Sequence, residues 1–214
     1  MSNGFRDIEM VSHYEILRTF LTQIKKEYKE VVKSTFKRGQ PIIKPLMRYR
    51  EIDVIIEILK SLRPVKCLEW GVGYSTLVFP KYIPREADWF TIEHNRRWAE
   101  EFIQINQNPN VKIFHIAPNQ YPWTDAYGDG AYSDLTDYIE FPSKLGKFNF
   151  ILIDGRARSS ALIKAHELLE KNGIVILHDA VRKYNMSLIT CINFRFYLKI
   201  IEKMKAVCGL GVGN

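Results

Sequence analysis

Residues 65–79 read VKCLEWGVGYSTLVF, a short apolar run that leads into glycine-rich backbone and then into a helix start. Gly71 and Gly73 lack a Cβ atom, so the backbone can turn tightly and approach a ligand closely at these positions. The helix that follows presents its first N–H groups beside the turn, where they can bind a ligand. This pattern predicts the ligand-binding turn of an open α/β sheet.

Four more apolar runs follow, and helical patterns separate them. The expected strands cover residues 65–70, 89–93, 111–116, 148–154 and 173–178. Asn95 precedes a helical pattern over 96–106, and Ser159 or Ser160 precedes another over 161–171, with Gly173 just beyond. Strands that alternate with helices predict a doubly wound, mostly parallel sheet.

An N-terminal extension precedes this alternating pattern. Apolar residues recur at helical spacing over 16–32, and a second helix over 52–62 is stopped by Pro64. We therefore expect an N-terminal helical cap over 1–45 and an α/β domain over 46–214.

Two later segments complete the pattern. Residues 117–147 are long for a connection in such a sheet and rich in aromatic side chains, as lids often are. For residues 194–203 an antiparallel strand pair is expected, with a helix as the alternative.

The composition limits the class of protein. The chain has 214 residues, 46% of them hydrophobic and 26% charged, which is typical of one globular domain. Its apolar runs are short and its first residues are charged, so we expect a cytoplasmic protein without a membrane partner. Cys67, Cys191 and Cys208 are odd in number and lack close pairing, which favours reduced thiols over disulfides or a zinc site.

The net charge of +7 is unevenly distributed. Residues 1–50 hold 11 Lys and Arg against 5 Asp and Glu, residues 51–150 hold 10 against 14, and residues 151–214 hold 10 against 5. The basic ends leave nucleic acid open as a partner, but solvated helix faces are the favoured interpretation because basic patches alone are weak evidence.

Glu69 separates two cofactor classes. The third position of the dinucleotide fingerprint is Thr76 instead of glycine, and Glu69 lies at the strand end, where we expect it to face the ligand. A carboxylate beside a pyrophosphate is unfavourable, whereas it suits a cationic ligand. The pattern therefore favours S-adenosylmethionine over NAD, with an NAD-binding oxidoreductase as an alternative.

An acidic residue followed by Gly-x-Gly after the first strand resembles the first motif of the class I S-adenosylmethionine-dependent methyltransferases. The run GYSTL over 73–77 is similar to the small-molecule O-methyltransferases of the catechol type, and the resemblance covers roughly residues 50–214. It implies a Rossmann-like cofactor domain over 46–214, with Glu69 near the methionine end or its water network. The residues it places along the cofactor are Glu69, Gly71, Val72, Gly73, Tyr74 and Ser75.

A second acidic residue supports this interpretation. Glu93 ends the second expected strand, 20 positions after Gly73. A carboxylate there can accept hydrogen bonds from both ribose hydroxyls, although an ordinary strand-end charge is the alternative. His94 either borders the adenine or is an exposed loop histidine.

Polar residues also follow the fourth and fifth strands, at the edge where open α/β sheets bind ligands. Asp154 is expected to orient the acceptor or contact the methionine amino group. His178 or Asp179 is expected to remove a proton from an acceptor hydroxyl or amine. The alternative for His178 is a hydrogen bond in the core.

Three further residues are candidates for acceptor binding. Arg156 and Arg158 can clamp a carboxylate or phosphate, with surface cations at a helix start as the alternative. Trp123 is expected in the substrate-facing wall that the 117–147 segment forms.

The resemblance also bears on metal dependence. Catechol-type enzymes hold a divalent cation with an Asp after the fourth strand and an Asp-Asn pair after the fifth. Asp154 and Asp179 match that arrangement, but Ala180 replaces the Asn, so a divalent metal is not favoured.

The chain carries no phosphate loop, nucleophile elbow or suitably placed cysteine, and residues 154–157 read DGRA where amino-directed nucleic-acid methyltransferases carry Asn-Pro-Pro-Tyr. We therefore expect methyl transfer to an oxygen or nitrogen of a small-molecule acceptor. The alternatives are a nucleic-acid methyltransferase, an NAD-binding oxidoreductase and a non-catalytic module of the same fold.

Overall fold

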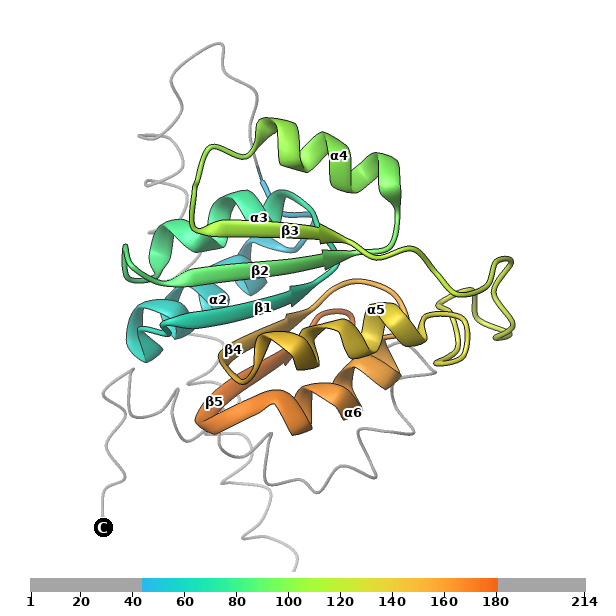
Figure 1. Cartoon of the computed structure of the whole chain (residues 1–214). Coiled ribbons are helices and arrows are strands. Elements are labelled where there is room, and N and C mark those ends of the chain that lie inside the picture. The colour runs from blue at the N-terminus through green and yellow to red at the C-terminus, as the bar shows by residue number, and fades with distance from the viewer. Residues whose placement is uncertain (1–43, 181–214) are drawn as a thin grey trace, which may run out of the picture. The chain divides into compact units, whose positions relative to one another are not determined.

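The computed structural model describes residues 44–180, which form a five-stranded sheet between helices (Figure 1). Predictions for nearly all of the 1–45 cap, for the 16–32 helix and for the 194–203 strand pair lie outside the described residues, as do Cys191 and Cys208. Cys67 is a buried free thiol in the first strand. Within residues 44–180 we find no helix with the length and apolarity to cross a membrane.

The sheet is parallel throughout and has the order β3-β2-β1-β4-β5. Its strands are β1 (Lys66–Trp70), β2 (Asp88–Glu93), β3 (Val111–His115), β4 (Phe148–Ile153) and β5 (Leu169–Leu177). The chain winds outward from β1 through β2 and β3, and then from β4 to β5 on the other side. The winding direction therefore reverses between β1 and β4, and ligands bind at the carboxyl end of such a reversal point.

Both faces of the sheet are apolar, because parallel strands are covered on each side. In Figure 1, α2 (Tyr49–Leu62) and α3 (Tyr74–Val78) lie behind the sheet, while α5 (Thr136–Glu140) and α6 (Arg158–Leu168) lie in front. The largest fully buried side chains include Trp70 on the front side and Trp89 on the back side. The sheet thus separates two cores.

The predicted cap of one helix and the predicted end of another are confirmed. In α2, the Glu51 carboxylate accepts the Arg48 N–H at 2.9 Å, and the helix ends before Pro64. In α4 (Arg96–Ile105), the Asn95 side chain accepts the Trp98 N–H at 3.1 Å. Because helix N-termini leave several N–H groups unpaired, these side chains fix where each helix begins.

The boundary between α6 and β5 differs from the prediction. The helix begins after Ala157, at a left-handed φ of +48°, and not at Ser159 or Ser160. The Asp129 carboxylate accepts the Arg158 N–H at 2.9 Å, so a residue distant in sequence supplies the cap. The helix also stops at Leu168, because Leu169 already pairs with Phe148 in the sheet.

The long segment after β3 is an ordered loop that leads into α5 and the 3-10 helix η2 (Phe141–Leu145). Asp134 accepts hydrogen bonds from the N–H groups of Thr124 and Ala131, at 2.8 and 2.9 Å. Asp125 accepts the Gly130 N–H at 2.7 Å. These buried or partly buried carboxylates hold the loop in a defined shape.

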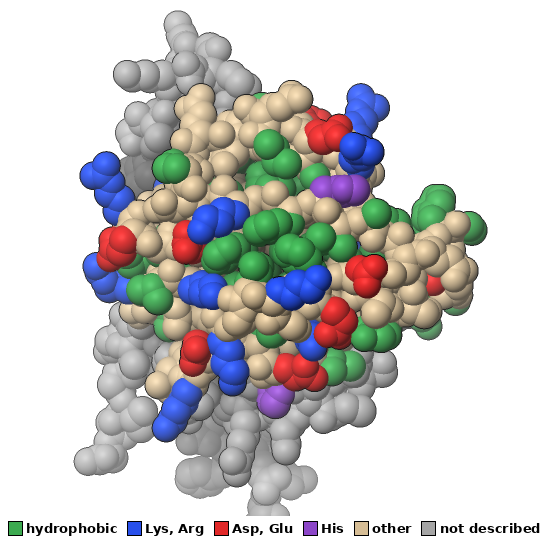
Figure 2. All heavy atoms as spheres, in the orientation of Figure 1, with side chains coloured by type: hydrophobic (Ala, Val, Ile, Leu, Met, Phe, Trp, Pro, Cys, Tyr) green, Lys and Arg blue, Asp and Glu red, His purple; other side chains and the backbone are tan. Residues whose placement is uncertain are grey.

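Hydrophobic side chains gather on the face between α4 and α5, with basic side chains beside them (Figure 2). Phe90 and Phe114 stack there, with ring centroids 6.4 Å apart, and Phe114 contacts Phe141 at 5.0 Å. The ammonium group of Lys112 lies 4.9 Å from the Phe90 centroid, and that of Lys144 lies 5.6 Å from the Phe141 centroid. We call these five residues, together with Lys66, the lysine-rimmed patch.

Candidate functional site

The glycine-rich turn after β1 packs directly against the turn after β4. Gly71 has a φ of +94°, and a Cβ atom there would lie 2.7 Å from the Gly155 backbone. The Gly71 N–H donates to the Ile92 carbonyl at 2.9 Å, so the turn is also tied to β2. Glycine is required at position 71 by both the backbone conformation and the close approach.

Glu93 holds this turn from the end of β2. Its side chain is 3% exposed, and its two oxygens accept the N–H groups of Val72 and Asn95 at 2.9 and 2.7 Å. Each carboxylate oxygen has two lone pairs, so Glu93 keeps acceptor capacity for a ligand. His94 is partly buried, and its Nδ1 lies 2.8 Å from a Glu93 oxygen without hydrogen-bond geometry.

Glu69 is placed differently from the expectation that it faces the ligand. It is fully buried and accepts hydrogen bonds from Thr76 at 2.7 Å and Trp89 at 2.9 Å, as well as from Ser75 and Thr91. The reason is the alternation of side chains along β1, which points this carboxylate into the layer of α3. Burial raises its pKa to about 7, against the lowering effect of the hydroxyl and indole donors. Glu69 therefore stabilises the glycine-rich turn through its buried hydrogen bonds with Ser75 and Thr76.

The other residues of the glycine-rich turn contribute either backbone hydrogen bonds or side-chain packing. The Val72 carbonyl accepts a hydrogen bond from the Trp98 indole at 2.6 Å, and the Gly73 N–H donates to the Thr76 hydroxyl at 3.1 Å. Tyr74 packs edge-on against Phe102 of α4, with centroids 5.5 Å apart. The turn therefore offers its backbone, and not the Tyr74 ring, to the strand edge.

Asp154 and His178 meet at the ends of β4 and β5. The His178 Nδ1 lies 2.7 Å from an Asp154 oxygen, and its Nε2 lies 3.6 Å from Glu51 of α2 and 3.8 Å from Asp179. The Asp154 hydrogen bond raises the pKa of His178; burial opposes this effect, and the charges of Asp154 and Asp179 reinforce it. Asp154 and His178, which the sequence predicted for the site, therefore lie within hydrogen-bond distance of each other. Glu51, which was not predicted, lies beside them.

Arg158 is turned into the protein and does not face an open acceptor site. Its side chain is 7% exposed, and its guanidinium donates to Asp154 at 3.1 Å, Asp179 at 3.5 Å and the carbonyls of Gly155 and His178. These partners use its donors, so the predicted clamp is not available from this side chain. Arg156 donates to the Gly128 carbonyl at 3.0 Å, which ties the loop to the same turn.

Trp123 lies beside His94, next to the end of β2. It is partly buried, and its ring centroid is 5.8 Å from that of His94 and 5.1 Å from that of Tyr121. This part of the 117–147 segment therefore lies beside the end of β2, and its role in facing a substrate stays a prediction. The structure places Trp123 beside His94, the residue that the sequence predicts near the adenine. The sequence alone could not show this contact.

The carboxyl edge also holds buried polar atoms that lack partners. Within residues 44–180, the buried side-chain atoms without a hydrogen bond are His94 Nδ1, Asp129 Oδ1 and the Tyr138 hydroxyl. The charges of Glu93 and Asp129 both act on Tyr138, whose ring centroid is 5.8 Å from that of His94. Buried polar groups are normally paired, so this cluster indicates a site that a polar ligand completes. The residues present therefore fit a nucleoside cofactor.

The metal pattern that the resemblance implies is not matched by the donor set. Within the described range, no group of three or more His, Cys, Asp or Glu side chains is arranged to hold a metal ion. Both oxygen donors expected for the catechol-type site, Asp154 and Asp179, are paired with Arg158.

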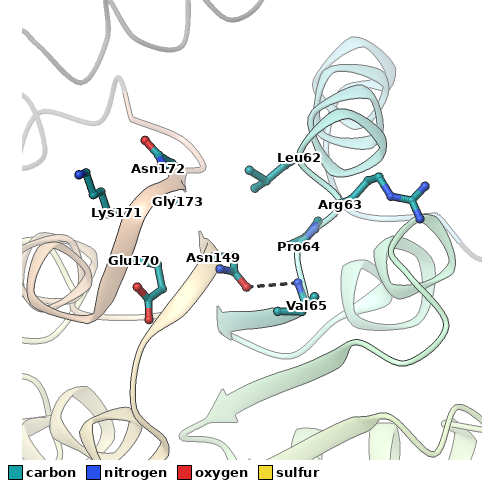
Figure 3. Close-up of a pocket in the computed structure, with 9 residues that line it drawn as sticks. All are labelled: Leu62, Arg63, Pro64, Val65, Asn149, Glu170, Lys171, Asn172 and Gly173. Atoms are coloured by element: carbon teal, nitrogen blue, oxygen red, sulfur yellow. Dashed lines mark hydrogen bonds between the residues drawn. The ribbon is translucent and has the colours of Figure 1, made fainter.

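A pocket of about 320 Å³ lies at the opposite, amino edge of the sheet (Figure 3). Its lining includes Arg63 at the end of α2, Asn149 in β4 and Lys171 in β5. The Asn149 side-chain oxygen already accepts the N–H groups of Val65 and Lys66, at 3.2 and 3.1 Å. This pocket lies away from the strand ends where the candidate site residues converge.

Sequence reasoning missed Glu51 and Asp129 as members of the site, and it placed Tyr138 only within the substrate-facing loop. These residues come from α2, the loop after β3 and α5. No local motif marks them, because only the docking of those elements brings them to the strand edge.

Comparison with known proteins identifies the fold. No protein-family model matches the sequence. A methyltransferase-like protein from Silicibacter pomeroyi is 17% identical, with a TM-score of 0.53 over 69% of this chain and 79% of its own. A methyltransferase from Geobacter sulfurreducens is 11% identical, with a TM-score of 0.52 over 76% and 85%.

An O-methyltransferase from Bacillus cereus, solved in complex with SAH, is 14% identical, with a TM-score of 0.52 over 85% of this chain and 79% of its own. These likenesses show that residues 44–180 have the class I methyltransferase-like, doubly wound fold, as the sequence predicted.

Proposed function

We propose that this chain, built on a class I methyltransferase-like fold, is an S-adenosylmethionine-dependent methyltransferase acting on an oxygen or nitrogen of a small-molecule acceptor. One observation carries the proposal. The Gly71–Gly155 contact joins the turn held by Glu93 to the turn that carries Asp154, so a cofactor-type site and an acid–base pair share one strand edge. This edge is the reversal point of the sheet.

The cofactor would be held by the backbone of the glycine-rich turn and by Glu93. When bound, S-adenosylmethionine supplies a methyl group already activated on a sulfonium. The contribution of the chain is to fix geometry, since Gly71 and Val72 are tied to β2 and α4 by hydrogen bonds and Gly73 is tied to α3. Such positioning is a large part of catalysis when two reactants must meet along one line.

His178 would remove the acceptor proton. With its Nδ1–H donated to Asp154, the Nε2 atom is the basic nitrogen that can accept a proton from a hydroxyl or amine. The carboxylates of Glu51 and Asp179, at 3.6 and 3.8 Å, would stabilise the imidazolium that forms. Asp154 positions the ring and fixes its tautomer.

The charges at this end of the crevice favour a small acceptor over nucleic acid. Within residues 44–180, the carboxylates of Glu51, Asp154 and Asp179 surround His178, and the Arg158 guanidinium that pairs with two of them is buried. A phosphate backbone gains affinity from accessible cations, whereas carboxylates predominate around His178. The crevice is therefore suited to a neutral or cationic acceptor.

Calorimetric titration of purified, cofactor-free protein tests the proposal. We expect S-adenosylmethionine and S-adenosylhomocysteine to bind with micromolar Kd, on the order of −8 kcal/mol, and NAD to give no heat. Glu93→Ala should weaken binding by tenfold or more, because it removes the carboxylate that both holds the turn and faces the ligand.

Glu100→Ala is the matched control, since Glu100 is an exposed glutamate of α4 paired with Arg96. It should bind as the wild type does. Absence of binding by both sulfur ligands would refute the proposal, and NAD binding in their place would support an oxidoreductase.

A further inference from the structure

The hydroxyl of Tyr138 reaches the point where the two glycine turns meet. Its ring is fully buried in the front core, from α5. A Cβ atom on Gly155 would lie 2.0 Å from this hydroxyl, and the same atom would lie 2.9 Å from the Gly71 nitrogen. The hydroxyl therefore occupies the space that Gly155 leaves open, next to the Gly71 turn.

No residue of the described range accepts a hydrogen bond from this hydroxyl. Burial raises the pKa of Tyr138 well above its ordinary value of 10, and the charge of Glu93 raises it further, with the Arg156 backbone amide in opposition. The group is thus a neutral O–H donor at physiological pH. A buried donor without an acceptor is costly, so its presence calls for a missing partner.

Glu93 defines what that partner can be. As a carboxylate it only accepts hydrogen bonds, and the N–H groups of Val72 and Asn95 use two of its four lone pairs. Tyr138 is a buried donor on which the charge of Glu93 acts. A ligand hydroxyl satisfies both at once, because it donates to Glu93 and accepts from Tyr138.

We infer that Tyr138 is a contact of the cofactor site and that its hydroxyl donates a hydrogen bond to a ribose hydroxyl that Glu93 also binds. This inference rests on the proposed function and deepens it. Tyr138 is then a residue that recognises the nucleoside of the cofactor, and not a part of the wall that faces the acceptor. It also explains why an aromatic side chain with a polar end stands where the front core meets the strand edge.

The test is a comparison of ligands and variants by calorimetry. Wild type, Tyr138→Phe and Tyr132→Phe are titrated with S-adenosylhomocysteine and with its 2′-deoxy and 3′-deoxy analogues. Tyr138→Phe should raise the Kd for S-adenosylhomocysteine about three- to tenfold. For the analogue that lacks the contacted hydroxyl, wild type and Tyr138→Phe should bind equally.

Tyr132→Phe is the matched control from the same segment, since it removes an exposed hydroxyl that donates to Glu140 at 3.0 Å. It should bind all three ligands as the wild type does. Cofactor-free Tyr138→Phe should unfold at the wild-type temperature or above, because the substitution removes an unpartnered polar atom from the core.

The outcomes separate the two proposals. If wild type binds but Tyr138→Phe has the same Kd, the inference is overturned and the proposed function stands. A loss of affinity that is equal for all three ligands, accompanied by a lower unfolding temperature, assigns Tyr138 a structural role and also overturns it. If wild type binds none of the ligands, the proposed function fails and the inference fails with it.

Discussion

A single oxygen of Asp154 serves two cations. It accepts from His178 Nδ1 at 2.7 Å and from Arg158 Nη2 at 3.1 Å. Because the His178 hydrogen bond stabilises the protonated imidazole, the pKa of His178 lies above its usual 6.5. At a given pH the neutral ring that can accept a proton is therefore less populated than in an ordinary histidine, and proton removal is favoured on the alkaline side.

Asp154→Asn should lower the pKa of His178. The substitution removes the hydrogen bond to a charged acceptor, which is the largest cause of the raised pKa; burial and the Arg158 charge, which lower the pKa, and the Asp179 charge, which raises it, remain. A histidine titration followed by NMR measures the change without any acceptor.

The exposed His166 gives an internal reference in the same spectrum, and its titration should be the same in both proteins. An unchanged His178 pKa in Asp154→Asn would show that another group sets it.

At the scale of elements, the β1 and β4 turns form one structural unit. Gly71 and Gly155 touch through their backbones, and Tyr138 of α5 closes the contact from the front core. Three elements far apart in sequence must therefore reach their final positions together. Substitutions at this contact should be strongly coupled, because they share the same space.

Gly155→Ala should destabilise the protein by about 1–3 kcal/mol, the usual cost of overpacking. The added Cβ atom would lie 2.0 Å from the Tyr138 hydroxyl. In the double variant with Tyr138→Phe the cost should be smaller than the sum of the single effects, since the nearest clashing atom is gone. Urea unfolding of the four proteins measures the coupling.

Gly73→Ala is the control, since its Cβ atom would meet only Ser75 at 3.6 Å and its φ of −172° is ordinary extended backbone. Additive effects of Gly155→Ala and Tyr138→Phe would contradict the shared-space explanation.

The elements that the sequence predicted well are those with a complete local signal. Apolar runs marked the strands, and Asn95 marked the start of α4. The start of α6 was mispredicted because its cap comes from Asp129, in a loop far along the chain. The start of β5 was mispredicted because Leu169 extends the strand by pairing with Phe148, a tertiary contact that overrides the helical pattern.

The candidate site was predictable to the same extent. Glu93, Asp154 and His178 converge because the carboxyl ends of parallel strands share one edge. The inward turn of Glu69 and of Arg158 was not predictable, since spacing places a residue at a strand or helix end without fixing its partners. Glu51 joins the site only through the packing of α2.

At the scale of the whole molecule, Glu69 makes stability depend on pH. Burial raises its pKa from an ordinary 4.5 to about 7, so the folded chain binds this proton more tightly than the unfolded chain. Its contribution is therefore largest below pH 4.5 and falls as the pH rises towards 7, by about 3 kcal/mol in total. His178, whose pKa is also raised, acts in the same direction at higher pH.

Glu69→Gln should remove this dependence. The difference in unfolding free energy between wild type and Glu69→Gln should be greatest at pH 4.5 and below and shrink by pH 8, as measured by urea unfolding across the range. The difference between the two proteins is the quantity to compare, because other groups also make stability depend on pH. The hydrogen bond from the Thr124 amide, opposed by burial, holds the pKa of Asp134 below its ordinary value. Asp134 therefore loses its stabilising effect as the pH falls, which is opposite to Glu69. A difference that stays constant with pH would mean that Glu69 is ionised throughout.

The lysine-rimmed patch has a consequence for how copies of this chain meet one another. Partly exposed rings such as Phe114 and Phe141 favour contact between two molecules, because the contact removes apolar surface from water. Here the ammonium groups of Lys66 and Lys112 lie over Phe90, and that of Lys144 over Phe141, at 4.9–5.6 Å from the ring centroids. A second copy would have to strip water from these charges before it reached the rings. The three lysines therefore raise the desolvation cost of any contact between two copies at this patch.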